Sequence, residues 1–159
     1  MRFRLIIPLF VLSFFCTQAI AANKDLPYFA SIKASEANVR TGPSVKYPIR
    51  WLYQKRHWPI QVTATFEDWR KITDIHGEAG WIHKSLLTSR RYAIIQSDSV
   101  EEVYRLPLMN SAVVAIVEKG VITRLESCKK QWCKIEVNEQ KGWISQSNLW
   151  GTSKGEIIE

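Results

Sequence analysis

Long apolar runs and helical periodicity are both scarce in this chain of 159 residues. The longest apolar stretch, Leu5–Cys16, spans 12 residues and is interrupted by Pro8 and Ser13. A membrane-spanning helix needs about 18 apolar residues, so we expect no stable membrane anchor. No stretch repeats its apolar residues with a helical period, which argues against a helical fold.

Side chains that carry nucleophilic or metal chemistry are also few, with three cysteines and three histidines in the whole chain. A Cys-His nucleophile needs a free thiol within reach of a base, and nothing in the spacing of Cys128 and Cys133 relative to His57, His76 and His83 indicates one. A zinc site needs closely paired ligands, and none occurs beyond the C-x4-C pair. We therefore expect no enzymatic activity, no metal and no cofactor.

The N-terminus has the pattern of a secretory signal peptide. Arg2 and Arg4 precede the apolar run, and Ala19-Ile20-Ala21 supplies a small-x-small cleavage site. We predict that residues 1–21 are removed and that the mature protein, residues 22–159, is periplasmic or secreted.

Positive charge is concentrated in the first half of the mature chain. Removing the signal peptide leaves 20 Lys/Arg against 15 Asp/Glu, a net charge of +5. Residues 28–91 hold 11 basic and 5 acidic residues (+6), whereas residues 92–159 hold 8 and 9 (−1). A basic face suits an anionic polymer such as a cell-wall glycan with peptide carboxylates; an ordinary solvated surface is the alternative. Nucleic acid is not an expected partner in this compartment.

Cys128 and Cys133 are the only cysteines of the mature chain. Exported proteins mature in an oxidising compartment, where an even pair of cysteines usually forms a disulfide. The C-x4-C spacing between two strand-like runs predicts a bridge across a four-residue hairpin loop. A loop this short stabilises the fold by roughly 2 kcal/mol in the chain-entropy model.

Two stretches of the chain, residues 69–87 and 132–149, read alike. The shared positions include two tryptophans and a glycine in each copy, namely Trp69, Gly80 and Trp81 in the first and Trp132, Gly142 and Trp143 in the second. Shared positions favour a structural role in the core or at its rim. A period of about 60 residues is long for a solenoid and favours two tandem domains.

The pattern within each copy is that of an all-β fold. In residues 60–66 apolar and polar residues alternate strictly, as in a strand with one buried face. Five or six short strands in about 60 residues predict a small barrel. We therefore expect a signal peptide at 1–21, one small barrel at 28–88, a second at 92–150 and a flexible tail at 151–159.

The segment AlaSerGluAlaAsnValArgThrGlyProSer at 34–44, TyrProIle at 47–49 and the later Gly-Trp-Ile resemble bacterial SH3 (SH3b) domains. The chain is most similar to exported two-SH3b-domain proteins of Gram-negative bacteria. The second copy has Val103-Tyr104-Arg105-Leu106-Pro107 in place of the Asn-x-Arg-x-Gly-Pro form. The resemblance implies wall peptides or other proteins as ligands.

Aromatic residues interleaved with cations mark the candidate ligand site in the first copy. Such a surface suits sugar rings or peptides with carboxylates. By analogy with the family, the candidate contacts are Arg40, Tyr47, Trp51, Tyr53 and Trp58. The alternative is that Trp51 and Trp58 pack against the second domain.

We therefore expect a non-catalytic binding protein whose partner is peptidoglycan or a cell-envelope protein. A structural or regulatory subunit that binds only a protein is the alternative, and a small hydrolase of unrecognised type is a third possibility.

Overall fold

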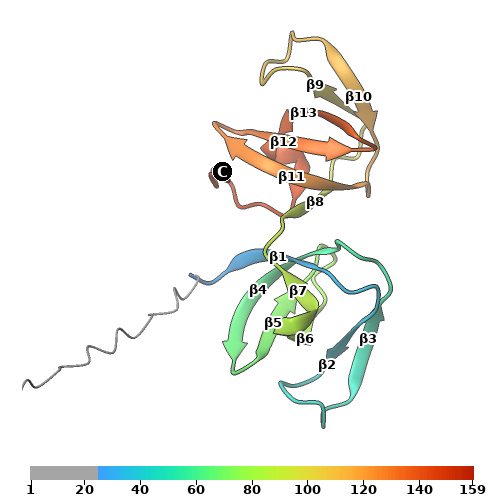
Figure 1. The fold of residues 1–159 in the computed structure, drawn as a ribbon, viewed down its shortest axis with the longest axis vertical. Coiled ribbons are helices and arrows are strands. Elements are labelled where there is room, and N and C mark those ends of the chain that lie inside the picture. The colour runs from blue at the N-terminus through green and yellow to red at the C-terminus, as the bar shows by residue number, and fades with distance from the viewer. Residues whose placement is uncertain (1–24) are drawn as a thin grey trace, which may run out of the picture.

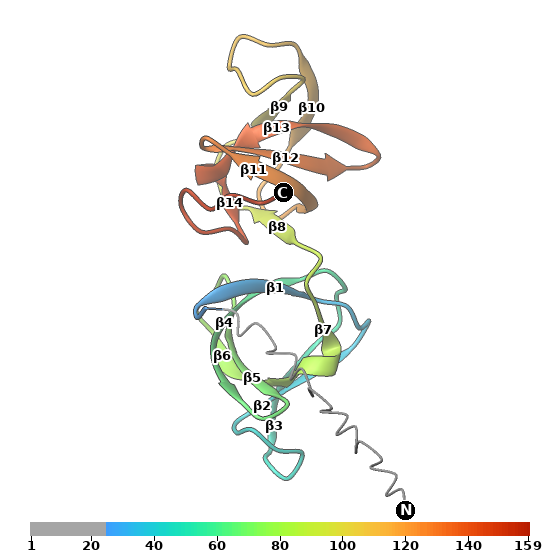
Figure 2. The same cartoon turned by 60° about the vertical axis from the view of Figure 1, so that its left-hand side comes forward.

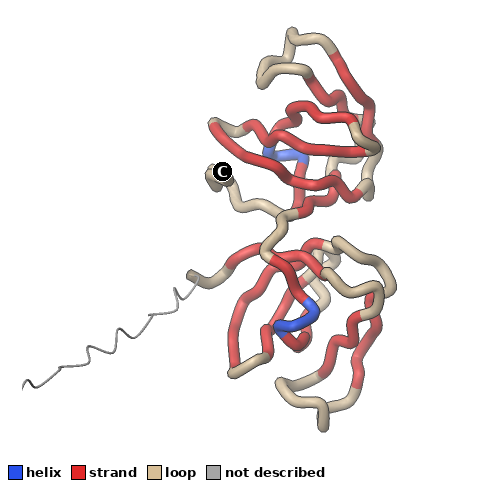
Figure 3. Tube along the Cα trace, viewed as in Figure 1, coloured by secondary structure: helices blue, strands red, loops and turns tan. Residues whose placement is uncertain are grey.

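The computed structural model describes residues 25–159, so the predicted signal peptide lies outside the described part of the chain. Two β domains follow each other along the long axis of the molecule (Figure 1). The only helices in residues 25–159 are the single 3-10 turns η1 (Lys84–Leu86) and η2 (Gln146–Asn148), as Figure 3 shows. Neither turn could cross a membrane. The predicted all-β class and tandem organisation are confirmed.

The first domain is a seven-stranded antiparallel sheet in the order β3-β2-β6-β5-β4-β1-β7. Figure 2 shows these strands curving around one interior. Its strands are β1 (Tyr28–Ile32), β2 (Ala37–Arg40), β3 (Ile49–Tyr53), β4 (Pro59–Phe66), β5 (Trp69–Thr73), β6 (Ala79–His83) and β7 (Leu87–Thr88).

The second domain repeats this order as β10-β9-β13-β12-β11-β8-β14. Its strands are β8 (Tyr92–Ile95), β9 (Glu101–Tyr104), β10 (Val113–Val117), β11 (Ile122–Lys129), β12 (Trp132–Val137), β13 (Gln140–Ser145) and β14 (Leu149–Trp150).

Each sheet encloses its own small aliphatic core. In β4, Ile60 and Val62 are fully buried while Thr63 is exposed, because alternate strand residues point to opposite faces. The first core consists of Ala30, Ile32, Ala37, Val39, Ile60, Val62, Ile72 and Ile82. The second consists of Ala93, Ile95, Val103, Val117, Leu125, Cys128, Cys133, Ile135, Ile144 and Leu149.

The repeated glycines mark where one hairpin crosses over the sheet in each domain. A Cβ on Gly80 would lie 2.5 Å from Val39 Cγ1, and one on Gly142 would lie 2.6 Å from Val103 Cγ1. No side chain fits at either contact without displacing the crossing strand. Glycine at these two positions lets β2 approach β6, and β9 approach β13.

The disulfide between Cys128 and Cys133 is confirmed, but the hairpin around it differs from the prediction. The loop has two residues, Lys130 and Gln131, which both adopt positive φ. Cys128 therefore lies directly opposite Cys133 in the β11–β12 ladder, with a Cα–Cα distance of 4.1 Å. Two-residue turns of this kind follow the twist of the strands, so the ladder continues past the cysteines.

The tail at 151–159 packs back onto the second domain, whereas the sequence predicts a flexible segment. Ile158 exchanges two backbone hydrogen bonds with Cys128 (2.9 and 3.1 Å). Glu156 accepts bonds from the Arg91 guanidinium at 2.6 and 3.1 Å. Arg91 is only 10% exposed, so this ion pair is largely screened from water.

Contacts between the domains are made near the linker. The His57 ring stacks on Tyr92 with centroids 4.1 Å apart, and Phe29 packs edge-on against Trp150 at 5.1 Å. Burial, followed by the charges of nearby arginines, lowers the pKa of His57. The neutral imidazole is therefore the form that stacks on Tyr92.

Candidate ligand-binding groove

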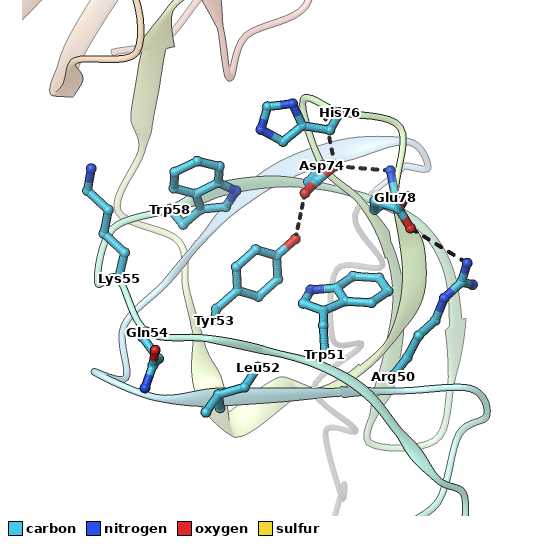
Figure 4. Close-up of a pocket in the computed structure, with 10 residues that line it drawn as sticks. All are labelled: Arg50, Trp51, Leu52, Tyr53, Gln54, Lys55, Trp58, Asp74, His76 and Glu78. Carbon is cyan, nitrogen blue, oxygen red and sulfur yellow. Dashed lines mark hydrogen bonds and ion pairs between the residues drawn. The ribbon is translucent and has the colours of Figure 1, made fainter.

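The first domain carries a groove of about 600 Å³ on the side where β3 faces the β5–β6 turn. Pockets that bind small ligands have volumes in this range. Figure 4 shows the side chains that line it. They come from β3, the loop after it and the turn that joins β5 to β6, namely Arg50, Trp51, Leu52, Tyr53, Gln54, Lys55, Trp58, Asp74, His76 and Glu78.

Three aromatic side chains form one wall of the groove. Trp51 and Tyr53 meet edge to face, with centroids 6.0 Å apart and planes at 84°. Trp58 lies 6.1 Å beyond Tyr53 with its plane tilted by 31°. Trp51 and Tyr53 are two positions apart on β3, so their side chains point to the same face of the strand. The loop after β3 brings Trp58 to that side. The three rings offer adjacent apolar faces to a ligand.

Asp74 anchors the opposite wall. One carboxylate oxygen accepts the backbone N–H groups of His76 (2.9 Å) and Glu78 (3.0 Å), which holds the turn closed. The other oxygen accepts the Tyr53 hydroxyl at 3.0 Å, as Figure 4 shows. Burial raises the pKa of Tyr53, and the negative charge of Asp74 raises it further. Tyr53 therefore stays a neutral donor at physiological pH.

Charged side chains border the aromatic wall. The Arg50 guanidinium lies 5.5 Å from the Trp51 ring centroid and 3.6 Å from Glu78. The Lys55 ammonium lies 5.9 Å from the Trp58 ring centroid. Such arrangements combine a hydrophobic surface with sites for carboxylates or polar groups.

The indole nitrogen of Trp58 is buried and has no hydrogen-bond partner among residues 25–159. In Figure 4 this nitrogen points toward the space between Tyr53 and His76. A buried N–H without a partner costs free energy.

Of the five predicted contact residues, the structure brings Trp51, Tyr53 and Trp58 together in this groove. Arg40 and Tyr47 lie elsewhere. The Arg40 guanidinium donates to the backbone oxygens of Val45 (3.1 Å) and Tyr47 (2.8 Å), so its side chain holds the loop between β2 and β3. The Tyr47 ring covers Gly42 in the same loop.

The four repeated tryptophans are half-buried strand residues outside both aliphatic cores. Trp69 packs edge-on against His83 at 5.4 Å, and Trp132 packs edge-on against Tyr104 at 5.8 Å. Trp81 and Trp143 are the residues that bridge to the crossing strand, through Arg40 and Tyr104 respectively. None of the four is among the side chains that pack against either core, so their structural role stays a prediction.

The second domain does not repeat the aromatic groove. The strand registers place Ala115 where the first domain has Trp51, and Val117 where it has Tyr53. Val121 and Val137 likewise stand at the positions of Trp58 and Asp74. All four second-domain residues are aliphatic and belong to or pack against its core.

Sequence reasoning missed Asp74, His76 and Glu78 as groove residues, because it treated this segment only as a turn. Their proximity to β3 is a tertiary contact between residues more than 20 positions apart. In the described part of the chain no group of three His, Cys, Asp or Glu residues could hold a metal ion.

A family model described as the bacterial SH3 domain matches the chain twice, at residues 33–88 and 100–151. A search of curated protein sequences finds no match.

Solved structures similar to the chain include two NlpC proteins from Trichomonas vaginalis and an NlpC/P60 family protein from Bacillus cereus. NlpC2 has 10% identity and a TM-score of 0.36 over 80% of this chain and 49% of its own. NlpC1 has 13% identity and a TM-score of 0.36 over 87% and 50%. The Bacillus cereus protein has 14% identity and a TM-score of 0.34 over 77% and 55%. The chain thus spans about half the length of these proteins.

Proposed function

Because this chain belongs to the bacterial SH3 domain family, we propose that it is a non-catalytic binding protein of the cell envelope whose aromatic groove takes peptidoglycan. The observation that carries this proposal is the wall of Trp51, Tyr53 and Trp58, bordered by Arg50 and Lys55. Aromatic faces pack on sugar rings and on the apolar parts of peptides, while cations pair with peptide carboxylates.

The charge distribution supports an anionic polymer as the ligand. The first domain carries the groove and also the excess of +6 in residues 28–91. Long-range attraction between this domain and a polyanion raises the rate and strength of association, and salt screens it. The signal peptide predicted at residues 1–21 would deliver the protein to the periplasm or the exterior, where peptidoglycan lies.

A protein partner in the envelope is the second candidate. The half-buried aromatic wall of Trp51, Tyr53 and Trp58 favours it, because tryptophan and tyrosine are enriched among residues that dominate protein interfaces. An interface built on aromatic anchors would largely survive high salt, whereas binding driven by net charge would fade.

Co-sedimentation of residues 22–159 with purified peptidoglycan sacculi, at low and high salt, tests the proposal. We expect the unaltered protein to sediment at low salt, and both Trp51→Ala and Trp58→Ala to stay in solution. Trp69→Ala removes a tryptophan of the same domain outside the groove and should still sediment. Thermal unfolding of each variant separates loss of a contact from loss of the fold. If the unaltered protein fails to sediment at either salt, the ligand is not peptidoglycan.

A further inference from the structure

The second domain has a groove of its own on a different face. It has a volume of about 400 Å³ and lies between β9, the loop before β10, the β11–β12 turn and η2. Figure 1 shows β9, β12 and β13 side by side in this domain. The aromatic groove of the first domain lies instead beside β3 and the β5–β6 turn, so the two copies carry grooves at positions that do not correspond.

Aromatic and apolar side chains form the floor of this second-domain groove. Tyr104 and Trp132 pack edge to face, with centroids 5.8 Å apart and planes at 85°. Met109 projects from the loop before β10 and is 77% exposed. An exposed methionine beside two aromatic rings is an adaptable apolar surface for a bound side chain.

Two adjacent carboxylates border that floor. Glu102 accepts the Tyr104 hydroxyl at 2.8 Å, and Glu101 accepts from the Asn148 side-chain amide. Neither carboxylate forms an ion pair with any residue in 25–159. No lysine or arginine lines the groove. The hydrogen bond to Glu102, together with burial and the charges of Glu102 and Glu101, raises the pKa of Tyr104.

The first domain lacks these features at the corresponding positions. The strand registers place Ala37 where the second domain has Glu101, Asn38 where it has Glu102, and Arg40 where it has Tyr104. The first copy therefore has an arginine bound by backbone oxygens of its own loop where the second has a tyrosine that donates to a carboxylate. Lys129 and Lys130 of the second domain line a separate hollow with Pro107 and Trp132 and form no ion pair with Glu101 or Glu102.

We propose that the second-domain groove binds a cationic segment of a partner protein, with an arginine side chain stacked on the Tyr104 or the Trp132 ring and paired with Glu101 and Glu102. A guanidinium is planar, stacks on aromatic faces and binds carboxylates through two N–H groups at once. Lysine offers the same charge without the planar stack, so arginine is the preferred residue. This site is independent of the aromatic groove and of its ligand.

Fluorescence polarisation with short labelled peptides tests the site. One probe carries two arginines among alanine and leucine, a second carries lysine at those positions, and a third carries glutamate. We expect residues 22–159 to bind the arginine probe roughly tenfold more tightly than the glutamate probe, as a charge-assisted hydrogen bond would give, with the lysine probe between them. Equal binding of the three probes, or no binding of the arginine probe, would overturn the proposal.

Variants locate the binding on the protein. Glu102→Gln keeps an oxygen that can accept from Tyr104 but removes the charge, so it should weaken the arginine probe severalfold. Glu118→Gln removes the same charge from an exposed residue outside the groove and should leave binding unchanged. Met109→Ala should also weaken binding without a folding defect, because Met109 is exposed. If Trp51→Ala abolishes binding of the arginine probe and Glu102→Gln does not, the probe binds the first domain and the proposal fails.

Discussion

Tyr53 donates its hydroxyl hydrogen to Asp74 across 3.0 Å, and this bond joins the two walls of the aromatic groove. Tyr53 comes from β3 and Asp74 from the turn after β5. Because Asp74 also accepts two backbone N–H groups of its own turn, the shape of the turn and the position of the aromatic wall depend on each other. The two walls of the groove are therefore joined by a polar contact as well as by packing.

We predict that Tyr53→Phe lowers the free energy of unfolding by about 1 kcal/mol, the usual net value of one hydrogen bond. It should also weaken ligand binding, because the turn is no longer tied to β3. Tyr47→Phe is the matched control, since Tyr47 is 46% exposed. Urea unfolding and sacculus co-sedimentation measure the two effects. Equal losses in both variants would contradict the role given to the Asp74 contact.

Gly80→Ala should destabilise the first domain by about 1–3 kcal/mol, as overpacking of a close contact does. The new methyl would lie 2.5 Å from Val39 Cγ1 and 3.2 Å from the Trp51 ring, so ligand binding should fall too. Gly142→Ala makes the corresponding clash in the second domain and should lower stability without affecting the aromatic groove. Thermal unfolding of the two variants measures the loss of stability, and co-sedimentation measures the loss of binding. Unchanged stability in both variants would show that the strands move apart without a loss of free energy of unfolding.

Removing the disulfide with Cys128→Ala and Cys133→Ala should lower the free energy of unfolding by about 2 kcal/mol. The hydrogen bonds between Cys128 and Ile158 use backbone atoms only, so the tail should stay docked. Hydrogen exchange at the Ile158 amide reports on the tail, and urea unfolding reports on the domain. Rapid exchange of that amide in an otherwise folded variant would show that the tail depends on the bridge.

Acid should release the tail through Glu156. Burial opposes ionisation, but the hydrogen bonds from Arg91 and Ser153 and the charge of Arg91 outweigh it and hold the pKa of Glu156 below its usual 4.5. A carboxyl whose pKa is lowered on folding contributes stability above the unfolded value, and this stability is lost as the pH falls through the folded value. The free energy of unfolding should therefore decline below pH 4.5 in part through this group.

Glu156→Gln tests that assignment. The variant should be less stable than the unaltered protein at neutral pH, and its stability should fall less steeply below pH 4.5. Glu159→Gln is the control, because Glu159 is exposed. Urea unfolding at several pH values on both sides of 4.5 gives the comparison. Parallel pH profiles for the two variants would assign the acid sensitivity to other groups.

Local patterns in the sequence predicted the strands and the duplication well. The alternation predicts the buried face correctly at Ile60 and Val62, but the register shifts between Val62 and Ala64 and Phe66 is 51% exposed. The repeated Gly-Trp pairs lie at equivalent crossings in the two sheets. Properties of this kind are set by near neighbours in the chain and by the period of the strand.

Contacts between distant segments were beyond local patterns. Arg40 was predicted to contact a ligand, yet its guanidinium donates hydrogen bonds to backbone oxygens of its own hairpin. The tail has a polar, glycine-containing sequence typical of frayed ends. In the structure Glu156 nevertheless pairs with the mostly buried Arg91, and Ile158 exchanges backbone hydrogen bonds with Cys128. Both outcomes depend on which groups the fold leaves unsatisfied, and a sequence pattern does not record that.

The aliphatic residues that replace the aromatic wall in the second domain determine how many aromatic grooves the protein offers to a ligand. With Ala115 and Val117 at the positions of Trp51 and Tyr53, residues 25–159 offer a single groove of the Trp51–Tyr53–Trp58 kind, although they contain two domains of one family. A repetitive ligand therefore gains no avidity from the tandem arrangement itself, since avidity requires two sites that bind at once. Tight attachment to a polymer would have to come from several molecules acting together, or from a second and different contact made by the other domain.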